Sequence, residues 1–321
     1  MNLRILLLAE EAAGIQTLRL LKETTHDVVA VLTSAPSEPG DRATVHGLAT
    51  RLGYPVMPLP RIQEAGFADT MRRLHVDLLL NVHALLVLPG DVVAAPLLGS
   101  FNLHPGPLPQ YAGLNAPSWA IYHGERSHAV TVHWMNAGID TGPIAFEASL
   151  SIDDEDTGFT LSAKCVRAGV PLLRELLAAA AQEPPAVPSR PQPTRPRRYF
   201  GREIPHGGRL LWTEPAASLV NFIRACDYSP FASPWGHPRA TLAGRELAVL
   251  SASRPGIRCD APPGTVGCQV GSGVLVAASD EWVEVRRVRT EGVTVCAAEV
   301  LKLGERFTIA REHRGMSHAA S

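Results

Sequence analysis

The chain has few of the features that mark secreted, zinc-binding or membrane-spanning proteins. Its 321 residues include five cysteines, an odd number without a CxxC pair, which favours neither a disulfide framework nor a zinc knuckle. No stretch approaches the roughly 20 apolar residues of a transmembrane helix. Neither sign of charge is in excess, because 30 basic residues stand against 31 acidic ones. These absences argue against a membrane protein and against a chain that mainly coats nucleic acid, and they are typical of the reducing cytoplasm.

The first turn of the chain also lacks the glycine fingerprint of dinucleotide-binding proteins. The apolar run Leu3–Ala9 predicts a buried parallel strand, but the segment AEEAAGIQ that follows contains Gly14 alone. Strands and helices then alternate, with further strands predicted at 26–32, 54–57 and 77–82 and helices at 14–21, 45–52 and 62–74. This alternation predicts an α/β fold with a doubly wound, Rossmann-like domain, and it gives a bound dinucleotide little support.

The length of the chain favours two domains. A helix is predicted from Gly158 to Ala181, with a kink or break at Pro171. The next segment, QEPPAVPSRPQPTRPRR, is rich in proline and predicts a semi-rigid linker. Short strands punctuated by glycine follow it. We therefore expect an α/β domain over 1–181, a linker over 182–198 and a smaller β-rich domain over 199–321.

Chemically active side chains gather between residues 100 and 142. Asn102 and His104 stand two apart in a predicted strand, so their side chains share one face. A loop with three prolines ends that strand, which places the pair at its carboxyl end, where open α/β sheets bind ligands. A second alternating run, 129–135, leads to a glycine-rich turn that holds Asp140. An amide, an imidazole and a carboxylate can support acyl transfer without a serine or cysteine nucleophile.

The same residues carry a resemblance to a known family. The segments FNLHPGPLP, YAGLNAPSWAI and GIDTGPI resemble the signature of the folate-dependent formyltransferases, which act on methionyl-tRNA, glycinamide ribonucleotide or amino sugars. The resemblance implies a catalytic trio of Asn102, His104 and Asp140, with 10-formyltetrahydrofolate as the co-substrate. It also implies an OB-like second domain. In such a site Asn102 donates to the oxyanion, His104 acts as a base or shares charge with the oxyanion, and Asp140 orients the imidazole.

The resemblance extends to residues that would bind the two substrates. The folate pterin is expected against main chain and apolar walls, at Leu85, Leu86, Leu88, Gly138 and Ile139. For the three leucines the alternative is that they pack the core. The acceptor is expected at Pro107, Tyr111, Asn115 and His133.

Histidines raise the question of a metal. Four of them could be considered as zinc ligands, namely His104, His123, His128 and His133. No cysteine or carboxylate completes a ligand set at a recognisable spacing. We therefore expect no metal.

The acceptor is the least determined part of the prediction. Methionyl-tRNA enzymes usually carry a basic residue and a Ser-Leu-Leu-Pro loop where this chain has GPLPQYA, with Gln110. Because a polyanion is bound through neutralised phosphates, we expect instead a small or carrier-linked amine, such as an amino-sugar nucleotide or an aminoacyl group. Three alternatives stay open: methionyl-tRNA, contacted by the arginines of 182–198; hydrolysis of the formyl donor; and a non-catalytic folate-binding protein. No membrane partner is expected, and the oligomeric state is open, a homodimer included.

Overall fold

The computed structural model describes residues 1–36 and 44–309, which divide into two compact units. The first unit contains residues 1–117, 126–153 and 160–201, and the second contains 118–125, 154–159 and the chain from 202 on. The sequence predicts a spacer at 182–198, whereas the structure places these residues in the first unit. The end of the predicted second domain, 310–321, lies outside the described residues.

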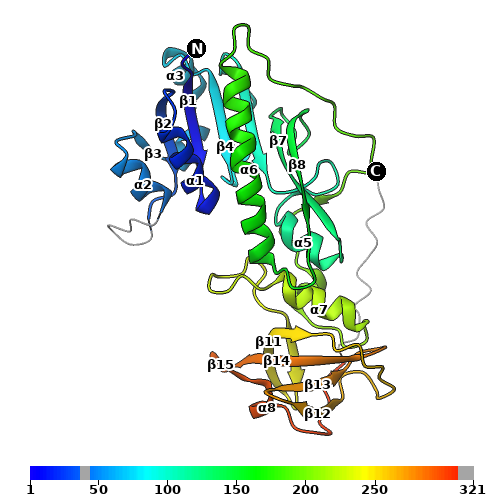
Figure 1. The fold of residues 1–321 in the computed structure, drawn as a ribbon. Coiled ribbons are helices and arrows are strands. Elements are labelled where there is room, and N and C mark those ends of the chain that lie inside the picture. The colour runs from blue at the N-terminus through cyan, green and yellow to red at the C-terminus, as the bar shows by residue number, and fades with distance from the viewer. Residues whose placement is uncertain (37–43, 310–321) are drawn as a thin grey trace. The chain divides into compact units, whose positions relative to one another are not determined.

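Seven strands of the described chain form one mixed sheet in the first unit (Figure 1). In spatial order they are β3 (Val56–Pro58), β2 (Asp27–Thr33), β1 (Arg4–Ala9), β4 (Leu78–Val82), β5 (Gly99–His104), β7 (Ser127–Trp134) and β8 (Ile144–Ser151). The first five strands pair in parallel with their neighbours, whereas β7 pairs antiparallel with both β5 and β8. The chain order reverses between β1 and β4, which is the doubly wound arrangement that the sequence predicts.

Helices follow most of these strands along the chain. They are α1 (Glu11–Lys22), α2 (Val45–Arg51), the 3₁₀ helix η1 (Leu59–Gln63), α3 (Phe67–Arg73), α4 (Gly90–Val93), α5 (Ala116–Tyr122) and α6 (Gly158–Ala180). The helix predicted at 62–74 is thus two shorter ones, because Gly66 adopts a left-handed conformation, with φ 80°, before α3. The sequence predicts a kink or break at Pro171, but the helix is not broken there, because α6 continues through this proline.

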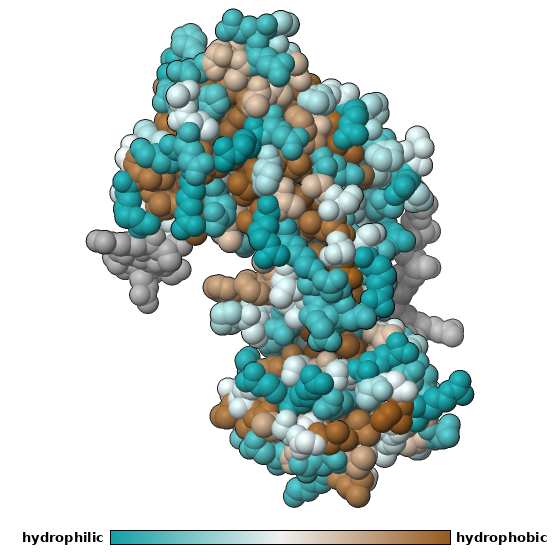
Figure 2. All heavy atoms as spheres, in the orientation of Figure 1, coloured by the Kyte–Doolittle hydropathy of each residue, from teal (hydrophilic) through white to brown (hydrophobic). Residues whose placement is uncertain are grey.

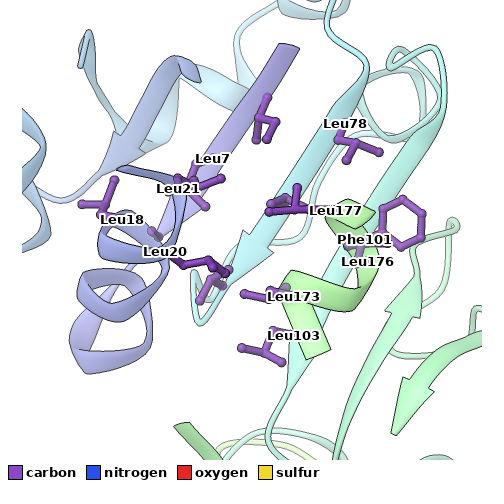
Figure 3. Close-up of a cluster of buried hydrophobic side chains, with 14 of the residues drawn as sticks. Leu7, Leu18, Leu20, Leu21, Leu78, Phe101, Leu103, Leu173, Leu176 and Leu177 are labelled. Carbon is purple, nitrogen blue, oxygen red and sulfur yellow. The ribbon is translucent and has the colours of Figure 1, made fainter. Parts of the chain in front are cut away.

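Apolar side chains alternate between the two faces of the sheet. On β1, Ile5 and Leu7 pack against α1, α2 and α6, whereas Leu6 and Leu8 pack against η1, α3 and α4. Figure 3 shows the first of these layers, with the leucines of α6 directed at those of β4 and β5. Burial of this leucine face offsets the proline in α6, whose cost in a helix interior is about 3 kcal/mol.

The second unit is β-rich, as the sequence predicts. Its sheet strands are β10 (Arg239–Leu242), β11 (Arg245–Ser253), β12 (Val266–Val270), β13 (Gly273–Ala277), β14 (Trp282–Thr290) and β15 (Val293–Cys296), all paired antiparallel. Its helices are η2 (Pro205–Gly208), α7 (Ala216–Ala225) and α8 (Ala297–Val300), together with most of α5, since residues 118–125 belong to this unit. One isolated β-bridge pairs Phe307 with Leu242 in the edge strand β10, and another pairs Arg306 with Thr265 next to the opposite edge strand β12. These bridges link the two edges of the sheet, as a barrel-like fold requires.

The face of the molecule drawn in Figure 2 is mixed in character. Figure 2 shows hydrophilic residues interspersed with hydrophobic ones on the face drawn there. No helix within residues 1–36 and 44–309 is long and apolar enough to cross a membrane.

Candidate active site

Strand β5 divides its side chains between the core and the candidate site. Phe101 and Leu103 pack in the layer beneath α6, so Asn102 and His104 project from the opposite face of the sheet. The antiparallel register with β7 sets His133 opposite Asn102 and Thr131 opposite His104. Four polar side chains are thereby brought to the carboxyl end of β5.

The proline loop after β5 folds back onto β7. His128 donates from Nε2 to the carbonyl oxygen of Pro105 at 2.9 Å, and the Thr131 hydroxyl donates to that of Gly106 at 2.8 Å. A Cβ atom at Gly106 would lie 2.9 Å from His104 Nε2, so the loop can pass this close to the imidazole only with glycine. The loop then presents the Tyr111 carbonyl oxygen 2.6 Å from His104 Nε2. Because a carbonyl only accepts, the proton of His104 is on Nε2.

The turn after β7 carries Asp140 into the same cluster. Asn136 holds the start of this turn, since its Oδ1 accepts from the Gly138 N–H at 3.1 Å and from the Thr141 hydroxyl. Asp140 itself has a left-handed backbone, with φ 52°, and the residue is only 8% exposed. The N–H of Gly113 donates to Asp140 Oδ2 at 2.8 Å.

Two imidazoles and an amide surround the Asp140 carboxylate. His104 Nδ1 lies 3.5 Å from Oδ2, and His133 Nε2 lies 3.3 Å from Oδ1. Asn102 Nδ2 donates to Oδ1 at 3.2 Å and lies 3.1 Å from His133 Nε2. Since His133 donates from Nδ1 to the Trp134 carbonyl, its Nε2 is the acceptor for Asn102 in the neutral ring. Both imidazoles therefore direct their basic nitrogens to the carboxylate, where an added proton would be stabilised by its charge.

Burial and charge set the protonation states of this cluster. Burial lowers the pKa of His104, which is 3% exposed, and the nearby Asp140 charge offsets that effect only in part. Burial by itself raises the pKa of Asp140, but three effects outweigh it: the positive charge that His104 carries once it is protonated, a hydrogen bond from protonated His133, and the hydrogen bond from the Gly113 N–H. The pKa of Asp140 is therefore well below its usual range. At neutral pH this is an ionised carboxylate beside a neutral base, which is ready to accept a proton.

We expect His104 to titrate below about pH 6.5, the ordinary value for histidine. A base with a lowered pKa stays neutral as the pH falls through 6.5, so kcat/KM should decline only at more acidic pH. The measurement is a histidine Cε1–H NMR titration from pH 5 to 8, with the His104 signal identified by its loss in His104→Ala. An inflection at or above pH 6.5 would contradict the neutral-base assignment.

The residues predicted to bind the pterin differ in how exposed they are. Leu88 packs in the core beside α3 and α4, and Leu86 is partly buried against the same layer. Leu85 is 75% exposed, so core packing does not explain it. Gly138 is exposed, and Ile139 is 42% exposed next to the buried Asp140.

The residues predicted to face the acceptor also differ in their surroundings. Pro107 and Asn115 are partly exposed, and Asn115 has a left-handed backbone, with φ 56°. The Tyr111 side chain is buried, with its ring stacked on Phe200 at 5.4 Å, and its carbonyl contacts His104. His133 is buried within the carboxylate cluster itself.

Two further polar residues near the cluster were not singled out from the sequence. Asn81 lies beside Asn102 in the β4–β5 register, and its buried Oδ1 accepts no hydrogen bond within residues 1–36 and 44–309. Gln192, in the proline-rich segment, donates to the carbonyl oxygens of Asp140 and Gly142. A short polar side chain in the otherwise apolar strand LLLNV was the available signal for Asn81.

Comparison with known proteins gives matches to two family descriptions and to curated relatives. Residues 4–177 match the family described as "Formyl transferase", and residues 204–306 match "Formyl transferase, C-terminal domain". A methionyl-tRNA formyltransferase of Chlorobium phaeovibrioides is 31% identical over 288 residues, which is 83% of each chain.

Solved structures share the fold at lower identity. HypX from Aquifex aeolicus, solved with tetrahydrofolic acid, has a TM-score of 0.63 and 18% identity, and the match covers 94% of this chain but only 47% of HypX. An N-formyltransferase from Helicobacter canadensis, solved with folinic acid and dTDP-3-aminofucose, has a TM-score of 0.66 and 16% identity, over 89% of this chain and 99% of that one. At these identities the likeness establishes the fold alone.

Proposed function

Because the chain belongs to the folate-dependent formyltransferase family, we propose that it transfers a formyl group from 10-formyltetrahydrofolate to a primary amine of a small or carrier-linked acceptor. The enzyme is an N-formyltransferase. The observation that carries the catalytic assignment is the contact of Asn102, His104 and His133 with one buried carboxylate, that of Asp140.

In the proposed reaction the amine lone pair attacks the formyl carbon and forms a tetrahedral oxyanion. Asn102, the partly exposed member of the trio, donates an amide N–H to that oxygen in exchange for its contact with His133. The proton lost by the amine goes to Nδ1 of His104, where Asp140 stabilises the imidazolium. Collapse of the intermediate breaks the bond between the formyl carbon and N10, and N10 takes back the proton from His104, which regenerates the neutral base. Tetrahydrofolate and the formylated amine are the products.

The donor is proposed to bind between two segments that follow strand ends. One is the loop from β4 to α4, with Leu85 exposed and Leu88 anchored in the core. The other is the turn of Asp140, with Ile139 exposed. Exposed apolar side chains on loop backbone suit a planar heterocycle, which needs an apolar wall and main-chain hydrogen bonds.

The acceptor is proposed to be an amino-sugar nucleotide or a carrier-bound aminoacyl group. The loop at 105–115 contains no lysine or arginine, so it offers little to a long polyanion. The arginine Arg197 lies beside the Asp140 turn instead. Arg197 donates to the Ile139 carbonyl at 2.7 Å, and its guanidinium lies 5.4 Å from the centroid of the Tyr199 ring. This arrangement is suited to one or two phosphates.

Methionyl-tRNA is the second candidate acceptor. It is favoured by the 31% identity with a methionyl-tRNA formyltransferase over 288 residues. Four exposed arginines of the proline-rich segment would supply its phosphate contacts: Arg190, Arg195, Arg197 and Arg198. A cytoplasmic location suits either acceptor and a chain whose five cysteines are all free thiols.

A panel of acceptors tests the proposal directly. Release of tetrahydrofolate from 10-formyltetrahydrofolate would be followed with amino-sugar nucleotides, aminoacyl carriers and methionyl-tRNA. We expect turnover with a member of the first two classes. Release at the same rate without any amine would identify a hydrolase, and binding of the donor without release would identify a non-catalytic folate-binding protein.

Salt dependence separates the two acceptor classes. For a small or carrier-linked amine, log(kcat/KM) should fall only gently with log salt. An acceptor held through several phosphates would give a slope of about −0.7 to −0.9 per contact. The measurement is a salt series with methionyl-tRNA, in the native protein and in a variant with the four arginines changed to serine. Efficient formylation that declines steeply with salt, and less steeply in the variant, would make tRNA the acceptor.

A further inference from the structure

The backbone of Asp140 is held in an unfavourable conformation. Its φ of 52° lies in the left-handed region, which costs a residue with a Cβ atom roughly 1–3 kcal/mol. Such a conformation persists only where its surroundings fix it. The hydrogen bonds of Asn136 to Gly138 and Thr141 hold the sides of the turn, but they leave the carbonyls of Asp140 and Gly142 to other partners.

Gln192 bonds both of these carbonyls. Its Nε2 donates to the Asp140 oxygen at 2.9 Å and to the Gly142 oxygen at 2.8 Å, so both amide hydrogens are used. Gln192 stands between Pro191 and Pro193, which restrict its backbone and reduce the entropy lost on bonding. The Arg197 contact with the Ile139 carbonyl fastens the same turn from the same segment.

We propose that Gln192 is a positioning residue for catalysis, which fixes the Asp140 turn so that the carboxylate stays within reach of His104 and His133. The inference rests on the proposed catalytic role of Asp140. Gln192 donates to the backbone of the turn, and it acts on the carboxylate through that backbone. Without its two N–H groups, two carbonyls lose their donor and the left-handed residue loses the contact that opposes its relaxation. The proline-rich segment is then part of the catalytic apparatus of the first unit.

Gln192→Met removes both donors and keeps the length of the side chain. We expect kcat to fall at least about 10-fold, because the carboxylate leaves its working position, with the KM for the formyl donor within about twofold of native. Gln192→Glu has an acceptor oxygen in place of Nε2, so its kcat should fall by at least as much. This variant tests the inference if Gln192→Met does not fold. Gln182→Met, at the start of the same segment, is the matched control and should keep the native kcat.

A double-mutant cycle with Asp140→Asn separates positioning from a general structural role. If Gln192 acts through the carboxylate, Gln192→Met should cost less than about twofold in the Asp140→Asn background. Equal losses in both backgrounds, or a native rate in both Gln192 variants, would overturn the inference and leave the role of Asp140 intact. A native rate in Asp140→Asn itself would overturn the proposed catalytic role and this inference with it.

Discussion

Asp140→Asn is expected to lower kcat by about 10²- to 10⁴-fold while the protein remains folded. The amide keeps an oxygen that can accept from the Gly113 N–H, and asparagine tolerates the left-handed backbone at this position better than most residues. What is lost is the negative charge that stabilises a proton on His104. His104→Ala removes the base itself and should lose at least about 10²-fold.

Single-turnover measurements with saturating formyl donor would test this expectation, with circular dichroism as the check on folding. Asp69→Asn is a suitable control, since that carboxylate is exposed on α3 and pairs with Arg72 at 2.7 Å. A rate within a few-fold of native for Asp140→Asn or His104→Ala would refute the proposed proton path.

Asn102→Asp should be more damaging than Asn102→Ala. Loss of an oxyanion donor typically costs about 10²- to 10³-fold in kcat, which is the expectation for alanine. Aspartate would add a second carboxylate where Asn102 Nδ2 now lies 3.2 Å from Asp140 Oδ1. Two carboxylates this close do not both ionise readily, and a negative group would repel the developing oxyanion. We therefore expect a further loss of about 10-fold or more.

The comparison needs kcat for both variants at the same pH, with the formyl donor saturating. Asn2→Asp, which makes the same exchange at an exposed position that accepts from Thr25, controls for added charge. Equal losses for the two variants of Asn102, or a smaller loss for aspartate, would count against an oxyanion role.

Much of the first unit followed from local patterns. The spacing of Asn102 and His104 placed both side chains on one face of β5, and the proline loop placed them at its carboxyl end. That reasoning needs only the two-residue period of a strand. The position of His133 opposite Asn102 depended on the antiparallel register of β5 and β7, which no local pattern specifies.

Contacts between segments that are distant along the chain could not be predicted from the sequence. Gln192 reaches Asp140 from 52 residues away in a segment whose prolines predicted a spacer. Proline removes backbone donors, but carbonyls and the side chains between prolines can still bond. Pro171 illustrates the same limit, because the apolar face of α6 that packs on the sheet is worth more than the hydrogen bond that proline removes.

The proline-rich segment also has a consequence for solubility. Strand β8 is the last of its sheet, and an unpaired edge strand is a template for aggregation. Arg190 closes the start of this edge by exchanging two backbone hydrogen bonds with Ile144, and the Pro188 carbonyl accepts from the Trp134 indole. The prolines of the segment offer no N–H to a further chain. A fragment that ended where the family match ends, at 177, would uncover this edge, so a separately produced first unit has to extend to about residue 201.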